Sequence, residues 1–370
     1  MSIKQTGRRW LAAGAVGALV LTGCASRDSD SAGSDRTPVG ETSELLTQPT
    51  ELPVTDPVEG DIPADITVAY LYNGIDQSTS FLNGMKAAAA ELGWTMHEFS
   101  YDPANPASFQ SAVISAVESG PDAMVTNTLV QQQLDPVYEL TSMAGIPLVA
   151  ATSSAVADEN LYPILTTQTN TAHAANLAAQ QLVVDAGDTP IHVAQVTVPQ
   201  FADTLGSMAA EVEKVVTGAC DECSHDLVEV SLTDVFTGQH VGQVVSYLQA
   251  NPEVNYLFAD AAQISLGLDA QLQQAGLTQI QVYGALPSQA QLSAVKDGAP
   301  GAWATFPLEV MGWAMIDTVA RAVTGDASNP WQDATLSYVV NASNVDAIDV
   351  ANPVFPADYR DQFKELWGRN

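Results

Sequence analysis

The chain has 370 residues, 46% of them hydrophobic, and its 43 acidic residues against 12 Lys and Arg give a formal net charge of −31. Nucleic acid and anionic lipid headgroups repel so acidic a chain, so we expect neither as a direct partner. Net charge carries no information about the fold, and a well-solvated surface is its simplest explanation.

The first residues predict export. A short cationic start precedes an apolar run over residues 10–21, which is too short to span a bilayer and is typical of a secretion signal. The motif Leu21-Thr22-Gly23-Cys24 resembles a bacterial lipobox, in which cleavage precedes a cysteine that carries lipid. The resemblance implies a signal peptide over residues 1–23 and a lipoprotein held through Cys24 on the outer face of the cytoplasmic membrane. An ordinary signal peptide is the alternative, and Arg8-Arg9 also permits twin-arginine export.

Residues 24–61 consist mostly of Ser, Asp, Thr, Pro, Glu and Gly. A segment with so few core-forming side chains predicts a disordered tether behind the lipidated Cys24. The body from Ile62 onward shows no second apolar span of membrane length. It is too large for one simple core, which favours two lobes.

Short apolar runs alternate with amphipathic stretches along the body. The runs are nearly continuous in apolar character, as in parallel sheets that helices cover on both faces, so we predict an α/β fold. Strands are predicted at residues 66–72, 96–101, 123–127, 147–151, 162–166, 192–197, 227–231, 256–259, 281–284, 302–306 and 335–340. Helices are predicted at residues 81–92, 106–118, 135–143, 170–185, 206–216, 239–250, 264–275, 288–297 and 310–323.

The order of these elements, together with the lipobox, resembles the ribose-binding class of periplasmic-type solute-binding proteins, whose fold the LacI sensor domains share. The most telling segments are 66–93, Ala144-Gly145-Ile146-Pro147-Leu148-Val149, 250–260, Leu266-Gly267 with Gln274-Ala275-Gly276, and Val282-Tyr283-Gly284. The resemblance covers residues 66–340 and implies the type I periplasmic binding protein fold: two Rossmann-like lobes joined by a three-crossover hinge. The chain should cross between the lobes near Thr166, Phe306 and Gln332.

The resemblance also implies a function. Such proteins are not enzymes; they capture a small-molecule ligand, as in sugar transport, and deliver it to the permease subunits of an ABC transporter. We expect a monomer without a cofactor. The implied lobes are residues 62–166 with 308–334 (N-terminal) and residues 167–307 with 335–370 (C-terminal).

The cleft departs from the sugar-binding pattern of this class. Where sugar-binding members carry an acid and an arginine, this chain has Thr152-Ser153, and the stacking aromatics of the first loop fall on Gln77 and Ser78. Pentose or hexose binding through the usual network is therefore not predicted. Ligands of open parallel sheets bind at the carboxyl ends of strands. The loops there give these candidate contacts: Asn73, Asp76, Gln77, Ser78, Asn127, Thr128, Thr152, Ser153, Phe201, Asp203, Asp234, Phe236, Asp260, Gln263, Leu286, Pro287, Phe306 and Glu309.

The body contains few cations, and none follows a predicted strand. Between residues 66 and 340 they are Lys86, Lys214, Lys296 and Arg321, all in or at the end of predicted helices. Sites for carboxylates and phosphates usually use Arg or Lys. The sequence therefore predicts a neutral or cationic ligand, such as a modified sugar, polyol, nucleoside or small aromatic compound. Each candidate acid can equally be a turn or helix cap.

Cys220 and Cys223 stand three residues apart, and outside the membrane a local disulfide is favoured over a zinc site that would need His225 and His240. The histidines show no metal-binding spacing, and no nucleophile elbow or phosphate-binding loop is present, so we expect neither metal nor catalysis.

The main alternative to a transport function is a sensor that presents its closed form to a membrane receptor, and an adhesion protein is a further one. Residues 356–367 predict a closing helix on one lobe.

Overall fold

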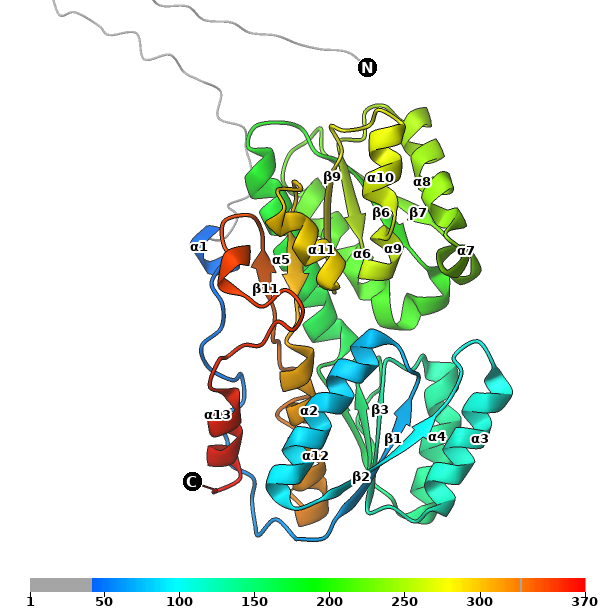
Figure 1. Ribbon diagram of the computed structural model, residues 1–370, viewed down its shortest axis with the longest axis vertical. Helices are drawn as coiled ribbons and strands as arrows, with labels where there is room; N and C mark the ends of the chain where they lie inside the picture. The colour runs from blue at the N-terminus through cyan, green and yellow to red at the C-terminus, as the bar shows by residue number, and fades with distance from the viewer. Residues whose placement is uncertain (1–41, 327, 370) are drawn as a thin grey trace, which may run out of the picture. The chain divides into compact units, whose positions relative to one another are not determined.

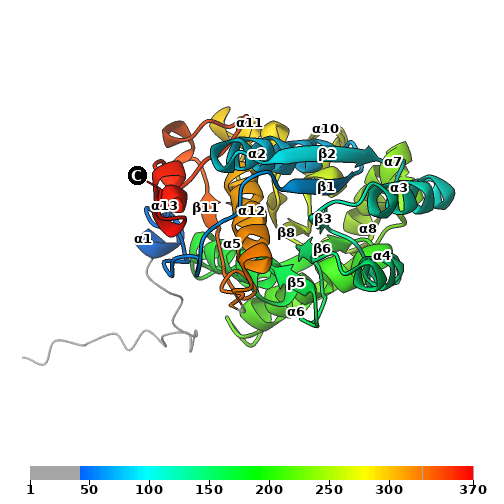
Figure 2. The same ribbon diagram turned by 90° about the horizontal axis from the view of Figure 1, so that it is seen from below.

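A computed structural model describes residues 42–326 and 328–369, whose strands form two separate sheets (Figures 1 and 2). The expected signal peptide, Cys24 and residues 24–41 of the expected tether lie outside the described residues. In the part of the chain that is described, no helix is long and apolar enough to cross a membrane.

The first sheet has five parallel strands in the order β2-β1-β3-β4-β5. Its strands are β1 (Thr67–Tyr72), β2 (Thr95–Ser100), β3 (Ala123–Asn127), β4 (Leu148–Ala151) and β5 (Leu161–Ile164). Alternate residues of β1 point to opposite faces: Val68 and Tyr70 join one apolar core, and Ala69 and Leu71 join the other. Both faces are buried, which explains why this strand is apolar throughout.

Two helices cover each face of the five-stranded sheet. Helices α2 (Asp76–Leu92) and α12 (Leu308–Thr324) pack side by side on one face (Figure 2). Helices α3 (Pro106–Glu118) and α4 (Gln131–Ala144) contribute to the core on the other. We call this assembly the five-stranded lobe.

The second sheet has the order β11-β10-β9-β8-β6-β7 and defines the six-stranded lobe. Its strands are β6 (His192–Thr197), β7 (Ser224–Glu229), β8 (Tyr256–Ala259), β9 (Gln281–Ala285), β10 (Trp303–Thr305) and β11 (Tyr338–Val340). The pairs are parallel except that β11 runs antiparallel to β10. Its helical segments are α5 (Ala172–Ala186), η2 (Pro199–Phe201), α6 (Ala202–Thr217), α7 (Leu232–Thr237), α8 (Gln239–Ala250), α9 (Ala262–Ser265), α10 (Leu268–Gln274), α11 (Gln289–Lys296) and η3 (Val345–Ala347).

The chain passes between the two lobes at the three predicted places. A π-helical turn, η1 (Thr167–Thr171), leads from β5 into α5. The second passage joins β10 to α12, and the third joins α12 to β11. Two crossing segments are tied together, because the backbone N–H groups of Leu165 and Thr166 donate to the carbonyls of Trp331 and Gln332.

Every predicted strand is present, but some helices differ from the prediction. The helix expected over residues 264–275 is interrupted, because Gly267 adopts a left-handed conformation (φ +83°) between α9 and α10. Helix α7 was not predicted at all; Ser231 caps it by accepting from the N–H of Asp234. Cys220 and Cys223 form a disulfide in the turn between α6 and β7.

The prediction of a disordered tether is wrong for residues 42–61. We call residues 42–61 the strap. It begins with the short helix α1 (Thr42–Leu45), and its Leu45, Leu52 and Val54 side chains are buried. Its backbone is also bound, since the N–H of Val58 donates to the carbonyl of Leu366 at 2.9 Å. A few apolar side chains are enough to hold the strap on the folded body, because the C-terminal segment supplies a surface against which they are buried.

The C-terminal helix α13 (Tyr359–Leu366) packs on the five-stranded lobe, not on the C-terminal lobe to which residues 335–370 were assigned. Trp367 stacks on Trp313 of α12, and its indole N–H donates to Asp317 at 2.8 Å. Tyr359 and Phe363 also contact the Trp313 ring. The aromatic face of α13 therefore covers α12, next to the strap (Figure 1).

Candidate ligand-binding site

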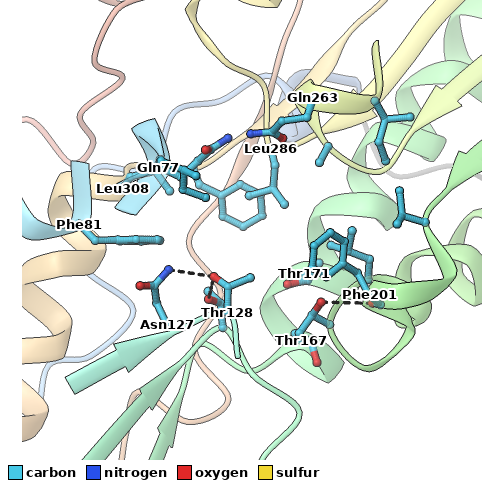
Figure 3. A pocket seen from close by; sticks show the side chains of 18 of the residues that line it. Gln77, Phe81, Asn127, Thr128, Thr167, Thr171, Phe201, Gln263, Leu286 and Leu308 are labelled. Atoms are coloured by element: carbon cyan, nitrogen blue, oxygen red, sulfur yellow. Dashed lines mark hydrogen bonds between the residues drawn. The ribbon is translucent and has the colours of Figure 1, made fainter. Parts of the chain in front are cut away.

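A cavity of about 200 Å³ lies where the carboxyl ends of strands from both sheets meet the hinge. Side chains surround it from several sides, with Phe81 and Asn127 facing Thr171 and Phe201 (Figure 3). A concave, mainly apolar cavity with a few polar groups is the usual form of a small-molecule site.

The five-stranded lobe contributes Gln77 and Phe81 from α2 and residues that follow β3 and β4. The hydroxyl of Tyr70 donates to Asn127 Oδ1 at 2.6 Å, and Asn127 Nδ2 donates to the Thr128 hydroxyl at 3.0 Å. Burial raises the pKa of Tyr70, which keeps its hydroxyl protonated as a donor. Both ends of the Asn127 amide are therefore used within the protein.

Three cavity residues adopt a backbone conformation that is rare outside glycine. Thr128, Thr152 and Leu286 have φ values of +56°, +47° and +53°, each just after a strand. All three line the cavity, and the Thr128 and Thr152 hydroxyls lie 3.1 Å apart. Such conformations persist only where the surroundings enforce them, and they cluster at functional sites.

The six-stranded lobe supplies a mainly apolar wall. Phe201 is the last residue of η2, and Leu205 lies in the first turn of α6. Phe236 is on α7, and its side chain is largely exposed to solvent. The remaining side chains of this wall lie on α6, α7 and α9 or just after β6, β8 and β9: Val198, Thr204, Leu232, Val235, Ala261, Gln263, Ile264 and Leu286.

The hinge lines the rest of the cavity. The π-helical turn η1 contributes Thr167, Asn170 and Thr171, and the crossing into α12 contributes Phe306, Leu308 and Met311. π-Helical turns are rare and occur often at functional sites. A ligand here would contact both lobes and the segments that join them.

Nine of the eighteen predicted contact residues line this cavity: Gln77, Asn127, Thr128, Thr152, Phe201, Phe236, Gln263, Leu286 and Phe306. The polar residues that the prediction missed are Thr167, Asn170, Thr171 and Thr204. The first three belong to η1, and strand-end reasoning does not reach a helical turn in a crossover.

The predicted neutral contacts that do not line the cavity have partners elsewhere. Asn73 accepts from the N–H of Ile75 in the turn before α2. Ser78 is buried behind Asn127, whose Nδ2 donates to its hydroxyl. Ser153 donates to the carbonyl of Ala150, so it offers neither a ligand contact nor a nucleophile.

No predicted acid lines the cavity. Asp76 stands in the exposed first turn of α2, and Asp234 bonds Ser231 and Gln243 at the start of α7. The Asp203 carboxylate lies 3.4 Å from the backbone N–H of Gln131, at the start of α4 in the other lobe. The expectation of a few carboxylates at the site is therefore not met, because these acids serve caps and contacts between elements.

Glu309 and Asp260 are held away from the cavity by different means. Tyr359, Asn352 and Arg360 all donate to Glu309, and although burial opposes ionisation, these bonds hold the pKa of its carboxyl below the ordinary value. Asp260 is fully buried beside the wall, where Gln195 Nε2 donates to it and His225 contacts the Gln195 oxygen. Burial raises the pKa of Asp260 to about 7.

Among the described residues that line the cavity, none is ionisable. Lys86, Lys214 and Lys296 form partly exposed ion pairs with Glu98, Glu211 and Asp346. Arg321 is buried near the far end of α12 with Asp317 and Asp326. The cations lie away from the cavity, as the sequence predicts.

Two α/β lobes joined by three crossing segments, with a cavity between them that no ionisable side chain lines among the described residues, are the architecture of a class of ligand-binding proteins. The chain matches the periplasmic binding protein domain over residues 66–327, and it belongs to that family. Members of this family are binding proteins rather than enzymes. The chain has no significant match among curated protein sequences.

Several solved structures share the fold. A sugar ABC transporter protein from Yersinia enterocolitica has a TM-score of 0.66 and 16% identity, covering 83% of this chain and 95% of its own. The 5-methylthioribose transporter solute-binding protein from Thermotoga lettingae has a TM-score of 0.65 and 16% identity, with the same coverages. The arabinose-binding component from Shewanella sp. ANA-3 has a TM-score of 0.63 and 16% identity, covering 82% and 97%.

Proposed function

We propose that this protein captures a small uncharged molecule outside the cytoplasm and delivers it to the permease subunits of an ABC importer. The observation that carries the proposal is the cavity at the three-segment hinge, whose lining contains no ionisable side chain among the described residues. A charged ligand would lose its hydration there without gaining an ionic partner, which is costly. The three structural relatives named above are described as parts of sugar, 5-methylthioribose and arabinose transporters, which supports the transport role.

Closure around the ligand would involve the two lobes turning about the crossing segments. We assign residues 62–166 and 308–334 to one moving body and residues 167–307 and 335–340 to the other. The carboxylate of Asp203 would then join the lobes in the closed form, because it faces the N-terminal amides of α4, where helix dipoles favour negative charge.

The anchor belongs to the same proposal. A lipid on Cys24 would keep the binding protein beside its permease on the outer face of the cytoplasmic membrane. Replacing Cys24 with Ser should move the protein from the membrane fraction to the soluble fraction of the cell envelope. If the Cys24→Ser protein stays with the membrane after a salt wash, the lipid anchor is wrong.

The binding proposal is tested by thermal unfolding of the Cys24→Ser protein with separate sets of neutral compounds, amines and organic acids. A ligand at about a hundred times its Kd stabilises the folded state by about 2.7 kcal/mol, which raises Tm measurably. We expect stabilisation by a neutral compound. Stabilisation by organic acids alone or by amines alone would contradict an uncharged ligand. A neighbouring histidine kinase gene without permease genes would favour sensing over transport.

A further inference from the structure

The hinge presents a hydrogen-bond donor that the protein does not use. Asn170 is completely buried, and its Oδ1 accepts from the backbone N–H of Leu336 at 2.9 Å. A backbone N–H can only donate, so this contact fixes the orientation of the amide, with oxygen toward Leu336. Asn170 Nδ2 is buried without a partner, and the residue lines the cavity. The protein therefore leaves an unpaired donor at a residue of the cavity lining, with the orientation of its amide already set.

A second unused polar atom lies on the five-stranded lobe. Gln77 comes from the first turn of α2 and lines the cavity, and its Oε1 is buried without a partner. Asn127, by contrast, has both amide ends bonded within the protein. Buried polar groups without partners are uncommon in folded proteins, and each one requires an explanation. A ligand that forms hydrogen bonds with both Asn170 and Gln77 would explain why each of them leaves a buried polar atom unpaired.

The remaining lining limits how many polar groups such a ligand can carry. Four phenyl rings, Phe81, Phe201, Phe236 and Phe306, line the cavity with aliphatic side chains around them, and of the other polar side chains there Asn127, Thr128 and Thr152 already bond one another. A free sugar has a hydroxyl on nearly every carbon, and several of these would be buried against carbon at a cost for each. A flat ring with polar atoms only at its edge can place its faces on phenyl rings instead.

We propose that the cavity takes an uncharged heteroaromatic compound of the nucleobase or nucleoside kind, and that Asn170 Nδ2 donates to a ring nitrogen or carbonyl oxygen at its edge. This inference rests on the proposed function, since it names the ligand class of the same site.

The test compares the Cys24→Ser protein with its Asn170→Asp variant by calorimetric titration. The probes are adenosine, inosine, uridine and thymine, with ribose, arabinose and glucose as the carbohydrate set. Aspartate keeps the shape and the acceptor for the Leu336 N–H and, once ionised, has no donor for the ligand, so the titrations are made at a pH above the raised pKa expected of a buried carboxyl. We expect binding of at least one heteroaromatic probe by the parent protein, no binding of the free sugars, and affinity for that probe at least tenfold lower in the variant.

Asn255 offers a matched control. Its Oδ1 also accepts from a backbone N–H, that of His192, but its Nδ2 donates to the carbonyl of Pro190, away from the cavity. Asn255→Asp should therefore lower Tm without changing probe affinity, whereas Asn170→Asp should lower both, because a carboxylate at this completely buried position is itself costly.

The outcomes separate this inference from the proposed function. Equal affinity in the parent and Asn170→Asp proteins would overturn the role of Asn170, and binding of sugars but no heteroaromatic probe would overturn the ligand class. The proposed function itself fails only if neutral compounds of every kind tested, including polyols, leave the Tm of the parent protein unchanged.

Discussion

Arg321 and Asp317 form a buried ion pair on α12, with Arg321 Nε 2.8 Å from Asp317 Oδ2 and both side chains almost inaccessible to solvent. The guanidinium also contacts Asp326 at 3.2 Å and donates to the backbone carbonyl of Asp56 in the strap. Asp317 in turn accepts from the indole N–H groups of Trp331 and Trp367. This one ion pair therefore connects α12, the strap and the C-terminal helix.

Replacing Arg321 with Met should lower the free energy of unfolding by about 3–5 kcal/mol, because two buried carboxylates lose their cation. Urea unfolding measures the change. The control is Lys214→Met, which removes an exposed pair with Glu211 and should change stability by less than about 1 kcal/mol. Equal effects of the two substitutions would show that the Arg321 pair has no special structural role.

The strap should behave as part of the folded body. A chain that begins at Ile62 lacks the buried Leu45, Leu52 and Val54, each of which contributes roughly 1.5–3 kcal/mol by burial. It also lacks the carbonyl of Asp56 that binds Arg321. We expect a free energy of unfolding at least about 3 kcal/mol below that of a chain beginning at Thr42. Superimposable urea curves for these two chains would instead support a tether that extends to residue 61.

Two glycines allow α2 and α12 to approach closely. A Cβ on Gly84 would lie 2.0 Å from the carbonyl oxygen of Glu309, and one on Gly312 would lie 2.4 Å from that of Phe81. These backbone atoms cannot move without separating the helices, which carry cavity residues Phe81 and Met311. Gly84→Ala and Gly312→Ala should each lower the free energy of unfolding by about 1–3 kcal/mol and weaken ligand binding.

Gly242 provides the control for these substitutions, because it lies inside helix α8 and a Cβ added there would meet no other atom within 4 Å. Gly242→Ala should raise the free energy of unfolding by about 0.5–1 kcal/mol, since alanine favours the helical backbone. Chemical denaturation of the three variants in parallel gives the comparison. Stabilisation by all three alanines would rule out a close contact between α2 and α12.

The strands could be predicted from sequence because burial on both faces leaves a local signal. Val68 and Ala69 point to opposite faces, yet both must be apolar, and the same rule applies along the sheet. The places where the chain crosses between the two lobes were predicted from the family resemblance. The predicted positions near Thr166 and Gln332 agree with the backbone hydrogen bonds that tie these two crossing segments together.

The acids and the hinge contacts could not be predicted in the same way. An acid after a strand can cap a helix, as Asp234 does beside Ser231, or reach the other lobe, as Asp203 does. Its local sequence is similar in either case. The role of Asn170 depends on Leu336, which lies 166 residues further along the chain. Periodicity and turn signals carry no information about contacts at that separation.

The last prediction concerns pH and the buried carboxyl of Asp260. Burial raises its pKa to about 7, outweighing its bonds with Thr197 and Gln195, whereas the carboxyl of an unfolded chain titrates near pH 4. Between these values the folded protein holds a proton that the unfolded chain has released. The stability from this group is therefore complete below pH ~4 and is lost as pH rises to about 7, on the order of 4 kcal/mol in all.

Asp260→Asn removes this titration and keeps an oxygen for Gln195. We expect the free energy of unfolding of the variant, relative to the parent, to increase steadily from pH 4.5 to 7.5 in urea titrations at constant ionic strength. His225 acts with the opposite sign, because burial lowers the pKa of its imidazole and its contribution rises with pH, but it is present in both proteins. A difference between variant and parent that does not change with pH would mean that Asp260 is ionised throughout this range in the folded protein.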